Sequence, residues 1–217
     1  MRFAEGEFYH IYNRGVDGRE IFLKTSDYQR FLDGLLAFNT NCPVTLREFD
    51  YGAKIAKNDK LCSLICYVLM KNHVHFVVRC ANPENLSKYL QKVFIGYTAF
   101  FNEKYRRIGV LFQGGSKSQH IDSDRYIRHI VDYVHLNPLD YFIPEWRNHG
   151  VVSIKVAKNK LLDYQYSSLS AFIGTESNSA LDFDIIREIF PNPKEVLNSM
   201  LEWSTSSLEN SDIAWEG

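Results

Sequence analysis

The chain has 217 residues, of which 45% are hydrophobic and 24% are charged, and its formal net charge at pH 7 is −1. This length is enough for one domain with a sizeable core, and the composition is that of an ordinary soluble globular protein. The near-neutral balance does not by itself indicate a nucleic-acid partner, and no apolar run approaches the roughly 18 residues that a membrane-spanning helix needs.

The cellular setting follows from the cysteines and from the first residues. Cys62 and Cys66 have three residues between them, and neither Cys42 nor Cys80 completes a second close pair of the kind that binds zinc. The N-terminal residues 1–7 lack the features of a signal peptide. We therefore predict a reduced, cytoplasmic protein that makes no use of a membrane.

Charge is distributed unevenly along the chain. Residues 88–128 contain eight lysines and arginines against three acids, whereas residues 180–217 contain eight acids against two basic residues. This asymmetry favours a basic working surface and an acidic C-terminal segment. The alternative, two solvated faces of opposite sign, is equally compatible with the pattern.

The first part of the chain alternates strand and helix patterns. Residues 7–13 alternate and are rich in aromatic side chains, which predicts a strand, and a turn follows at 15–18. An apolar stripe predicts a helix over 27–38, with Ser26 and Gln29 as a capping box. We expect a second strand at 44–49 and a polar loop over 50–60.

The central part has the strongest patterns. The continuous apolar run 61–70 predicts a strand that is buried on both faces, and 73–79 predicts the next strand. Apolar residues every three or four positions predict a long helix over 86–102. A last helix is expected over 124–136, capped by Ser123 or Asp124 and ended by Pro138.

The remainder of the chain is less regular. Short helices are expected at 185–190 and 193–203, before a polar end over 204–217. We predict a main domain over 1–145 and a partly helical, acidic C-terminal extension over 146–217.

Two histidines in the strand at 73–79 are candidate metal ligands. Side chains alternate across a strand, so His73 and His75 share one face while Val74 and Phe76 face the core. Two neutral imidazoles at this spacing can chelate one divalent cation. Taken alone, the pair is more often a pair of partly exposed surface residues.

A tyrosine and an asparagine share a face of the helix at 124–136. Tyr133 and Asn137 are four residues apart, which places the phenol beside a possible third ligand, the amide oxygen. A phenol is a poor nucleophile because its pKa is about 10, but a bound Mg²⁺ or Mn²⁺ can polarise a phosphate for attack. The combination predicts a metal-assisted tyrosine nucleophile, although each residue alone has an ordinary packing or capping role as its simplest explanation.

Basic residues near these elements suit a strand of phosphates, and the aromatic residues among them suit stacking on bases. The competing interpretation leaves the charges in water and the aromatic rings in the core. The candidate DNA contacts in this stretch are Lys88, Lys92, Lys104, Arg106, Arg107 and Lys117.

Four segments together resemble a known family, the His-hydrophobic-His single-strand DNA transposases with one catalytic tyrosine, and within it the branch of REP-associated tyrosine transposases. The resemblance covers roughly residues 8–141, with a weaker match near 164–174. The segments are YHIYNRG at 9–15, YVLMKNHVHFVVR at 67–79, FNEKYRRIG with FQGGSKS over 101–118, and YIRHIVDYVHLNP at 126–138.

The resemblance implies an α+β fold of the ferredoxin-like sandwich type, with a central antiparallel sheet. It implies His73 and His75 as metal ligands, Asn137 as a further ligand and Tyr133 as the nucleophile. It also implies an enzyme that cleaves and rejoins single-stranded DNA near hairpins through a 5′-phosphotyrosine, as a monomer or a homodimer and without a nucleotide cofactor. Arg14 is a plausible DNA contact, and His10 is either a structural residue or a support for the active site.

The sequence departs from the family at Gly115 and Ser116, where relatives usually carry an arginine and an aromatic residue. The departure keeps open an alternative, a non-catalytic protein that binds DNA hairpins. A third hypothesis is an unrelated metal-dependent hydrolase built on His73 and His75, with Tyr133 in a structural role.

Overall fold

A computed structural model describes residues 3–47, 49 and 59–205. Its centre is an antiparallel sheet of the strands β1 (Phe8–Arg14), β2 (Cys62–Met70), β3 (His73–Cys80) and β4 (Lys117–Ile121). The strands lie in the order β2-β3-β1-β4. With α1 (Thr25–Ala37) between β1 and β2 and α2 (Pro83–Lys104) between β3 and β4, this is the ferredoxin-like arrangement. The predicted fold class is therefore confirmed.

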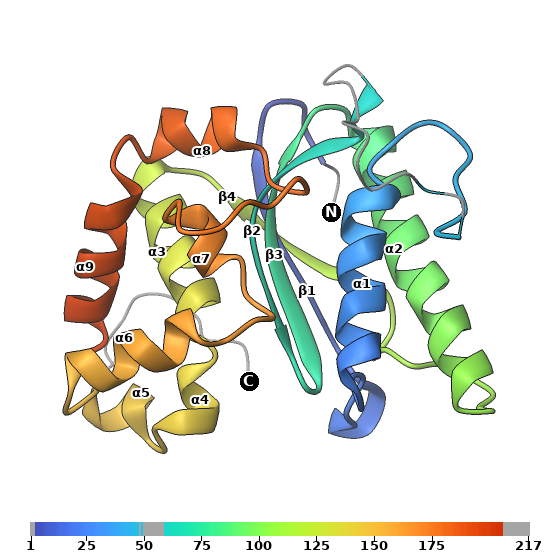
Figure 1. Cartoon of the computed structure of the whole chain (residues 1–217). Coiled ribbons are helices and arrows are strands. Elements are labelled where there is room, and N and C mark those ends of the chain that lie inside the picture. Colours follow the sequence, from blue (N-terminus) through green and yellow to red (C-terminus); the bar gives the residue numbers. More distant parts are fainter. Residues whose placement is uncertain (1–2, 48, 50–58, 206–217) are drawn as a thin grey trace.

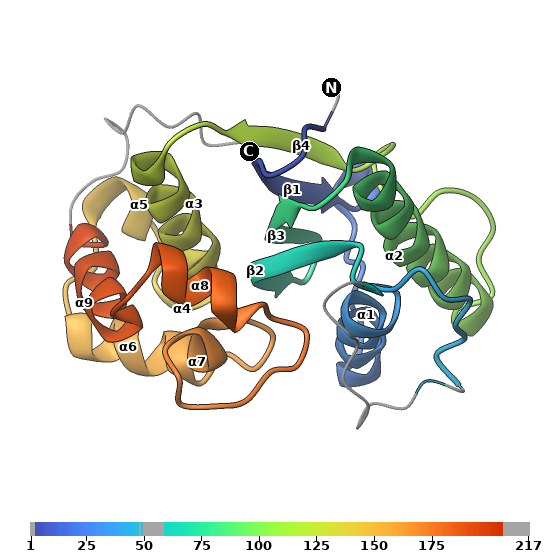
Figure 2. The ribbon, with the colours of Figure 1, turned by 90° about the horizontal axis from the view of Figure 1, so that it is seen from above.

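Helices cover both faces of the sheet. Figure 1 shows α1 and α2 on one face and α3 (Asp124–Leu136) with the later helices on the other, and the view from above in Figure 2 shows the sheet between these two layers. The later helices are α4 (Leu139–Phe142), α5 (Trp146–His149), α6 (Ile154–Leu162), α7 (Leu169–Phe172), α8 (Phe183–Ile189) and α9 (Pro193–Trp203). No helix within the described residues is long and apolar enough to cross a membrane.

The register of the strands decides which side chains face α3. Tyr12 pairs with His75 across β1 and β3, and Arg14 pairs with His73, so these four side chains share one face of the sheet. Phe76, in contrast, packs against Phe94 of α2 on the other face, with their ring centroids 6.1 Å apart. The expected alternation of the His pair with core residues is confirmed.

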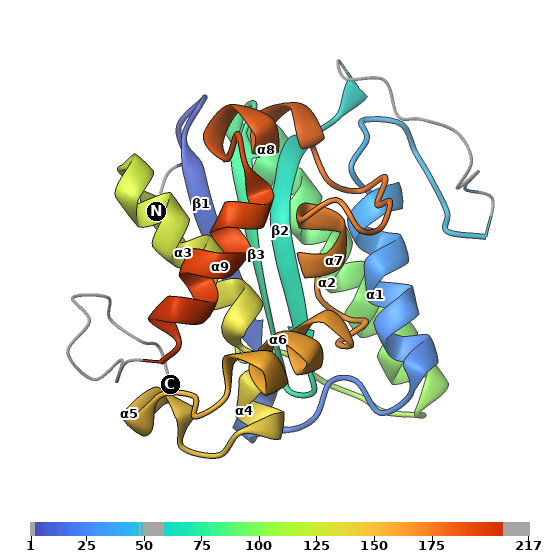
Figure 3. The same ribbon diagram turned by 60° about the vertical axis from the view of Figure 1, so that its left-hand side comes forward.

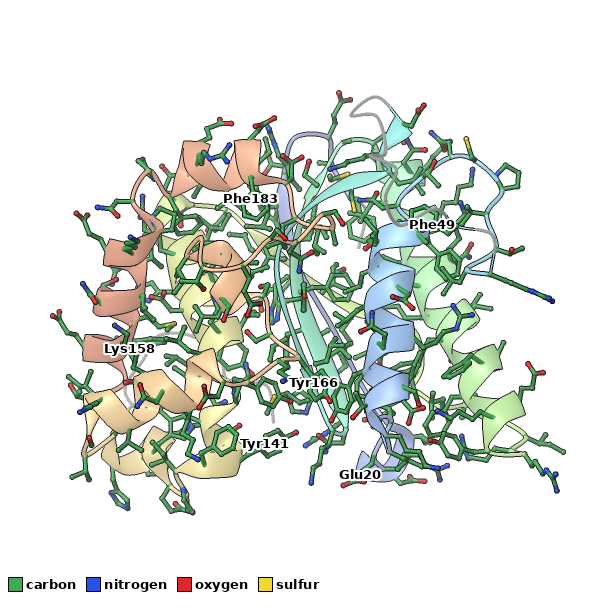
Figure 4. The ribbon with its side chains drawn as sticks, viewed as in Figure 1. Glu20, Phe49, Tyr141, Lys158, Tyr166 and Phe183 are labelled. Atoms are coloured by element: carbon green, nitrogen blue, oxygen red, sulfur yellow. The ribbon has the colours of Figure 1, made fainter. Side chains whose placement is uncertain are left out.

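The described part of the extension packs along the edge strand β2. Backbone amides of Leu69 and Ser168 donate to the carbonyls of Tyr166 and Tyr67, respectively, across this edge. Tyr166 then stacks on Tyr28 of α1 with ring centroids 3.7 Å apart, and Figure 4 shows Tyr166 between the extension and α1. The edge of β2 is thereby protected from pairing with another chain, while the predicted domain boundary at residue 145 stays a prediction.

Three predictions about the first helix and its surroundings are corrected. The helix starts at Thr25, two residues before the predicted start, and the Asp27 carboxylate accepts hydrogen bonds from the amides of Leu23 and Lys24 at 2.8 and 2.9 Å. The expected Ser26–Gln29 capping box is not the cap. Of the strand expected at 44–49, residues 44–47 and 49 are not in a strand, while residue 48 and the loop residues 50–58 lie outside the described residues.

Asp27 also holds α1 against the end of α2. Its buried carboxylate accepts hydrogen bonds from Lys104 at 2.6 Å and from Tyr105 at 2.8 Å. Burial alone would raise the pKa of Asp27, but these bonds and the two backbone amides hold the pKa below its ordinary value. The carboxylate is therefore a stabilising group in its charged form.

Replacing Asp27 by asparagine is expected to destabilise the protein by about 3 kcal/mol at neutral pH, because Lys104 loses its buried partner. Since the folded pKa is lowered, the contribution is present above the unfolded pKa and disappears as the pH falls through the folded value. Urea unfolding at neutral and acid pH measures both effects. Asp33→Asn, which removes only a surface hydrogen bond to Gln29, is the control and should change little.

Helix α3 begins and ends where the sequence predicts. The Ser123 hydroxyl accepts a hydrogen bond from the amide of Tyr126, and Asn137 forms the C-terminal cap before Pro138. Helix α3 also carries a carboxylate, Asp132, in an unfavourable environment. Oδ1 of Asp132 is buried and has no hydrogen-bond partner among the described residues, and burial raises the pKa of Asp132 to about 8 despite the nearby Arg128.

We expect Asp132→Asn to stabilise the protein near pH 8 by about 2 kcal/mol. Because the folded pKa of Asp132 is raised, its protonated form contributes fully to stability below the unfolded pKa. This contribution is lost as the pH rises through about 8. The variant should therefore unfold at a temperature that varies less between pH 4 and 9. An equal pH dependence in the variant and the parent would contradict this account, and Asp184→Asn on the exposed face of α8 is the control.

Candidate active site

A cavity of about 290 Å³ lies at the end of the sheet where β1 ends and β3 and β4 begin. Its lining brings together all four residues that the sequence predicts for catalysis and metal binding. His73 and His75 come from β3, and Tyr133 and Asn137 come from the last turn of α3. Figure 3 shows α3 on the near side of the sheet that contains β3.

The two histidines meet nearly at right angles. Their ring centroids are 5.0 Å apart with an interplanar angle of 84°. Nδ1 of His73 is hydrogen bonded to Oδ1 of Asn72 at 2.7 Å, which makes this nitrogen the donor because a carbonyl oxygen only accepts. The lone pair of His73 is therefore on Nε2, where a metal ion would need it.

Burial keeps these imidazoles neutral. The pKa of His73 is lowered to about 4 by burial, assisted by the positive charge of Arg14. His75 is only 4% exposed, and its pKa is lowered well below the ordinary value by burial and by the neighbouring His10 and His73. Neutral rings offer lone pairs at physiological pH, so protons do not compete with a cation for the pair.

Tyr133 lies against this pair. Its ring meets that of His75 edge to face, with centroids 5.4 Å apart, and the side chain is 7% exposed. The guanidinium carbon of Arg147 is 5.3 Å from the centre of the Tyr133 ring. A cation over the ring favours a negative charge on the phenol oxygen, which a nucleophilic tyrosine requires.

The side-chain amide of Asn137 is held through both its nitrogen and its oxygen. Its Nδ2 donates to the carbonyl of Tyr133 at 2.8 Å, and its Oδ1 accepts from Arg147 at 3.3 Å. A hydrogen bond to Asn137 would also stabilise protonated His73, so the amide lies within reach of that imidazole. The side chain is 1% exposed, and it lines the same cavity as the His pair.

The donor set fits a divalent cation with an incomplete protein shell. Two neutral imidazoles and one amide oxygen provide three ligand atoms without any negative charge. Among residues 3–47, 49 and 59–205, no three His, Cys, Asp or Glu side chains converge as a metal cluster. The remaining ligands would have to be oxygens of a bound phosphate and water, and such a site would depend on its substrate for charge balance.

Arg147 and Asp140 are among the cavity residues that were not predicted from the sequence. Arg147 of α5 binds Asp140 of α4 through Nε and Nη2, at 2.9 and 3.0 Å. Both residues line the cavity. They lie in a segment without a periodic pattern, so no local feature of the sequence marks them. The indole of Trp146 donates to the same carboxylate at 2.7 Å, which fixes the Arg147–Asp140 pair at the rim.

The rest of the lining comes from β1 and from the segment that leads into β4. Tyr12 could have been found from its alternation with His10 and Arg14, which share one face of the strand. Gln113 follows the isolated bridge between Gly15 and Phe112. These residues give the cavity a polar wall on the side of β1 and β4.

The candidate DNA contacts separate into two groups. Arg14 and Lys117 line the cavity. The other five belong to α2 or follow it, in the layer on the opposite face of the sheet. Lys88 and Lys92 bond to Asn41 and Thr40, Lys104 bonds to Asp27, and Arg107 bonds to Asn102. The structure thus does not bring Lys88, Lys92, Lys104, Arg106 and Arg107 to the cavity, and their role in DNA binding stays a prediction.

Gly115 and Ser116 lie outside the cavity, although they are close to it in sequence. They line a larger hollow of about 690 Å³ between α2 and the segment before β4, together with Leu90, Phe94 and Phe112. Asn13 borders both spaces. The departure from the family pattern therefore affects the neighbouring groove and leaves the cluster of His73, His75, Tyr133 and Asn137 intact.

Solved structures with a similar fold include a DNA-bound transposase. A REP-associated tyrosine transposase bound to a REP hairpin aligns with a TM-score of 0.51 and 12% identity, over 84% of this chain and 88% of that chain. A bacterial tRNA(His) guanylyltransferase-like protein in complex with GTP aligns with a TM-score of 0.35 and 9% identity, over 67% and 73%, which is too low to carry an argument. No family model and no curated protein matches. The resemblance seen in the sequence is confirmed at the level of the fold.

Proposed function

From a fold shared with a REP-associated tyrosine transposase, we propose that this chain is a DNA strand transferase with Tyr133 as its nucleophile. It would cleave a single strand near a hairpin and rejoin it. The observation that carries the proposal is the convergence of Tyr133, His73, His75 and Asn137 on one cavity, although they come from two elements some sixty residues apart. Of the seven candidate contacts, Arg14 and Lys117 are the two best placed to hold the DNA phosphates there.

The chemistry assigns a step to each group. The Tyr133 phenol oxygen attacks a phosphorus atom, the bond from phosphorus to the 3′ oxygen breaks, and a 5′-phosphotyrosine and a free 3′-hydroxyl result. The phenolic proton leaves to water in the open cavity, and the departing oxygen takes up a proton. Attack by a 3′-hydroxyl on the phosphotyrosine reverses these steps and rejoins a strand.

A cation bound by His73, His75 and Asn137, Mg²⁺ or Mn²⁺, would polarise the phosphate and neutralise charge that develops on its oxygens. The chain itself contributes the arrangement of the groups. Asn137 ties its position to the Tyr133 carbonyl, so the nucleophile and the proposed third ligand belong to one rigid turn of α3. Rigid placement of the nucleophile beside the phosphate lowers the entropic part of the barrier.

Arg147 is expected to assist this reaction from the rim. Arg147→Ala removes the cation over the Tyr133 ring and one hydrogen bond to Asn137, and should lower the single-turnover rate of cleavage by about 10- to 100-fold. Arg147→Lys keeps the charge but cannot form the bidentate hydrogen bonds to Asp140, so it should recover only part of the rate. Arg187→Ala, on the exposed face of α8, is the control, and an equal rate for the Arg147→Ala variant would refute this role.

The proposed function is tested by the formation of a covalent adduct. The protein is mixed with labelled single-stranded oligonucleotides that carry an imperfect hairpin, in Mg²⁺ or Mn²⁺, and the products are separated on a denaturing gel. We expect a shifted band that requires the cation and the hairpin. Cleavage without an adduct would favour the metal-dependent hydrolase.

A second candidate function is binding of DNA hairpins without cleavage. It is favoured by one observation, the presence of Gly115 and Ser116, beside the cavity lined by Tyr133, where the family pattern has an arginine and an aromatic residue. Hairpin affinity with no adduct in any divalent cation, for an oligonucleotide set that includes its binding site, would favour this function over the first.

A further inference from the structure

His10 of β1 forms a buried pair with the proposed ligand His75. Nε2 of His10 lies 2.9 Å from Nδ1 of His75, and their rings are stacked at 17° with centroids 5.1 Å apart. The two side chains are 5% and 4% exposed. A contact between two ring nitrogens at this distance is a hydrogen bond in which one nitrogen carries the hydrogen and the other its lone pair.

The surroundings of the other ring nitrogen of His10 indicate where its hydrogen lies. Nδ1 of His10 is buried and has no hydrogen-bond partner within the described ranges 3–47, 49 and 59–205. A buried N–H without an acceptor is rarer and more costly than a buried lone pair without a donor. The structure therefore favours the arrangement in which the hydrogen of His10 sits on Nε2 and points at His75.

That arrangement conflicts with cation binding. If His10 donates to Nδ1 of His75, the hydrogen of His75 sits on Nε2, and no lone pair remains for a cation on that atom. Binding through Nε2 requires His75 to carry its hydrogen on Nδ1 and donate it to His10. His10 must then carry its own hydrogen on the isolated Nδ1. Each ring moves one hydrogen, and neither changes its charge.

We propose that His10 is a positioning residue that couples cation binding to a tautomer exchange of the His10–His75 pair. Without a cation, His10 donates to His75, and with a cation at Nε2 of His75, His75 donates to His10. His10 thus supplies the acceptor that makes His75 a ligand, at the cost of leaving its own Nδ1–H without a partner. The inference deepens the proposed function, because it concerns the cation site on which that function rests.

The tautomers can be observed without DNA. In protein labelled with ¹⁵N in its histidines, long-range ¹H–¹⁵N correlation spectra distinguish an Nδ1–H ring from an Nε2–H ring. We expect His75 to be the Nε2–H form in the metal-free protein and the Nδ1–H form after addition of Zn²⁺, a diamagnetic probe. An Nδ1–H form of His75 in both states would overturn the proposal.

Affinity for Mn²⁺, measured by electron paramagnetic resonance, gives a second readout. His10→Phe removes the acceptor for Nδ1–H of His75 and should weaken binding by about 10- to 100-fold. His10→Gln offers an amide oxygen as the acceptor and should bind within about threefold of the parent. Unchanged affinity in the His10→Phe variant would overturn the proposal. The matched control is His129→Phe, which alters a histidine of α3 that does not line the cavity.

The outcomes separate this inference from the proposed function. Tautomer exchange in a protein that forms no DNA adduct would retain the role of His10 and refute the strand transferase. A protein that forms the adduct but keeps one fixed tautomer of the His10–His75 pair would support the strand transferase and refute the role of His10. If the His10→Phe variant does not fold, as judged by its unfolding temperature, the spectra of the parent and the His10→Gln variant decide.

Discussion

Replacing Tyr133 by phenylalanine is expected to abolish the covalent attachment of DNA, with a loss of at least about 10³-fold in adduct formation. The variant lacks the phenol oxygen that is proposed to become the ester oxygen, while its ring keeps the edge-to-face contact with His75. Because the side chain is buried and its shape is conserved, the fold should persist. The measurement is the adduct band on a denaturing gel.

Binding of the uncleaved hairpin oligonucleotide should be unchanged in the same variant, as measured by fluorescence anisotropy. The matched control is Tyr126→Phe, which alters another tyrosine of α3 that does not line the cavity and should leave the adduct intact. An adduct of normal yield with the Tyr133→Phe variant would show that a different residue is the nucleophile.

The second large effect is expected for His73→Ala. The change leaves one imidazole of the chelating pair, so Mn²⁺ affinity should fall by about 10²-fold and cleavage at low Mn²⁺ should be lost. Because His75 and Asn137 remain, a high concentration of Mn²⁺ should restore part of the rate. Mn²⁺ titrations of binding and of cleavage, compared at equal protein concentration, measure both expectations.

His120→Ala provides the control for a histidine of the same sheet. His120 pairs with Glu7 at 2.6 Å on β4 and does not line the cavity. Its replacement should leave Mn²⁺ affinity unchanged. Undiminished cleavage by the His73→Ala variant at low Mn²⁺ would refute the assignment of the His pair to the cation.

Strong periodic patterns made much of the fold predictable. The bounds of α3 follow from the Ser123 cap and from Pro138, and both are local features. Strand β4 was missed because its sequence, Lys117–Ile121, is short and polar and forms a strand through pairing with β1 at the edge of the sheet. Residues 44–47 and 49 of the strand predicted at 44–49 are not in a strand, because strand formation depends on how a segment packs against its neighbours and alternation alone does not determine it.

The candidate site could be predicted only within each element. The period of a strand places His73 beside His75, and the period of a helix places Tyr133 beside Asn137. Contacts between elements depend on the packing of α3 across the sheet, so the pairing of His10 with His75 and the arrival of Arg147 over Tyr133 required the structure. For the same reason, proximity in sequence did not show that Lys104 is bound to Asp27 in the other layer.

Mass spectrometry of the adduct shows directly whether Tyr133 forms the covalent bond to DNA. The adduct is trapped with a hairpin oligonucleotide and digested with nuclease and protease, and the peptide that carries the residual nucleotide is sequenced. We expect a phosphodiester on Tyr133 and a free 3′-hydroxyl on the released strand. A nucleotide attached to any other residue, or a 5′-hydroxyl on the released strand with a 3′-linked adduct, would contradict it.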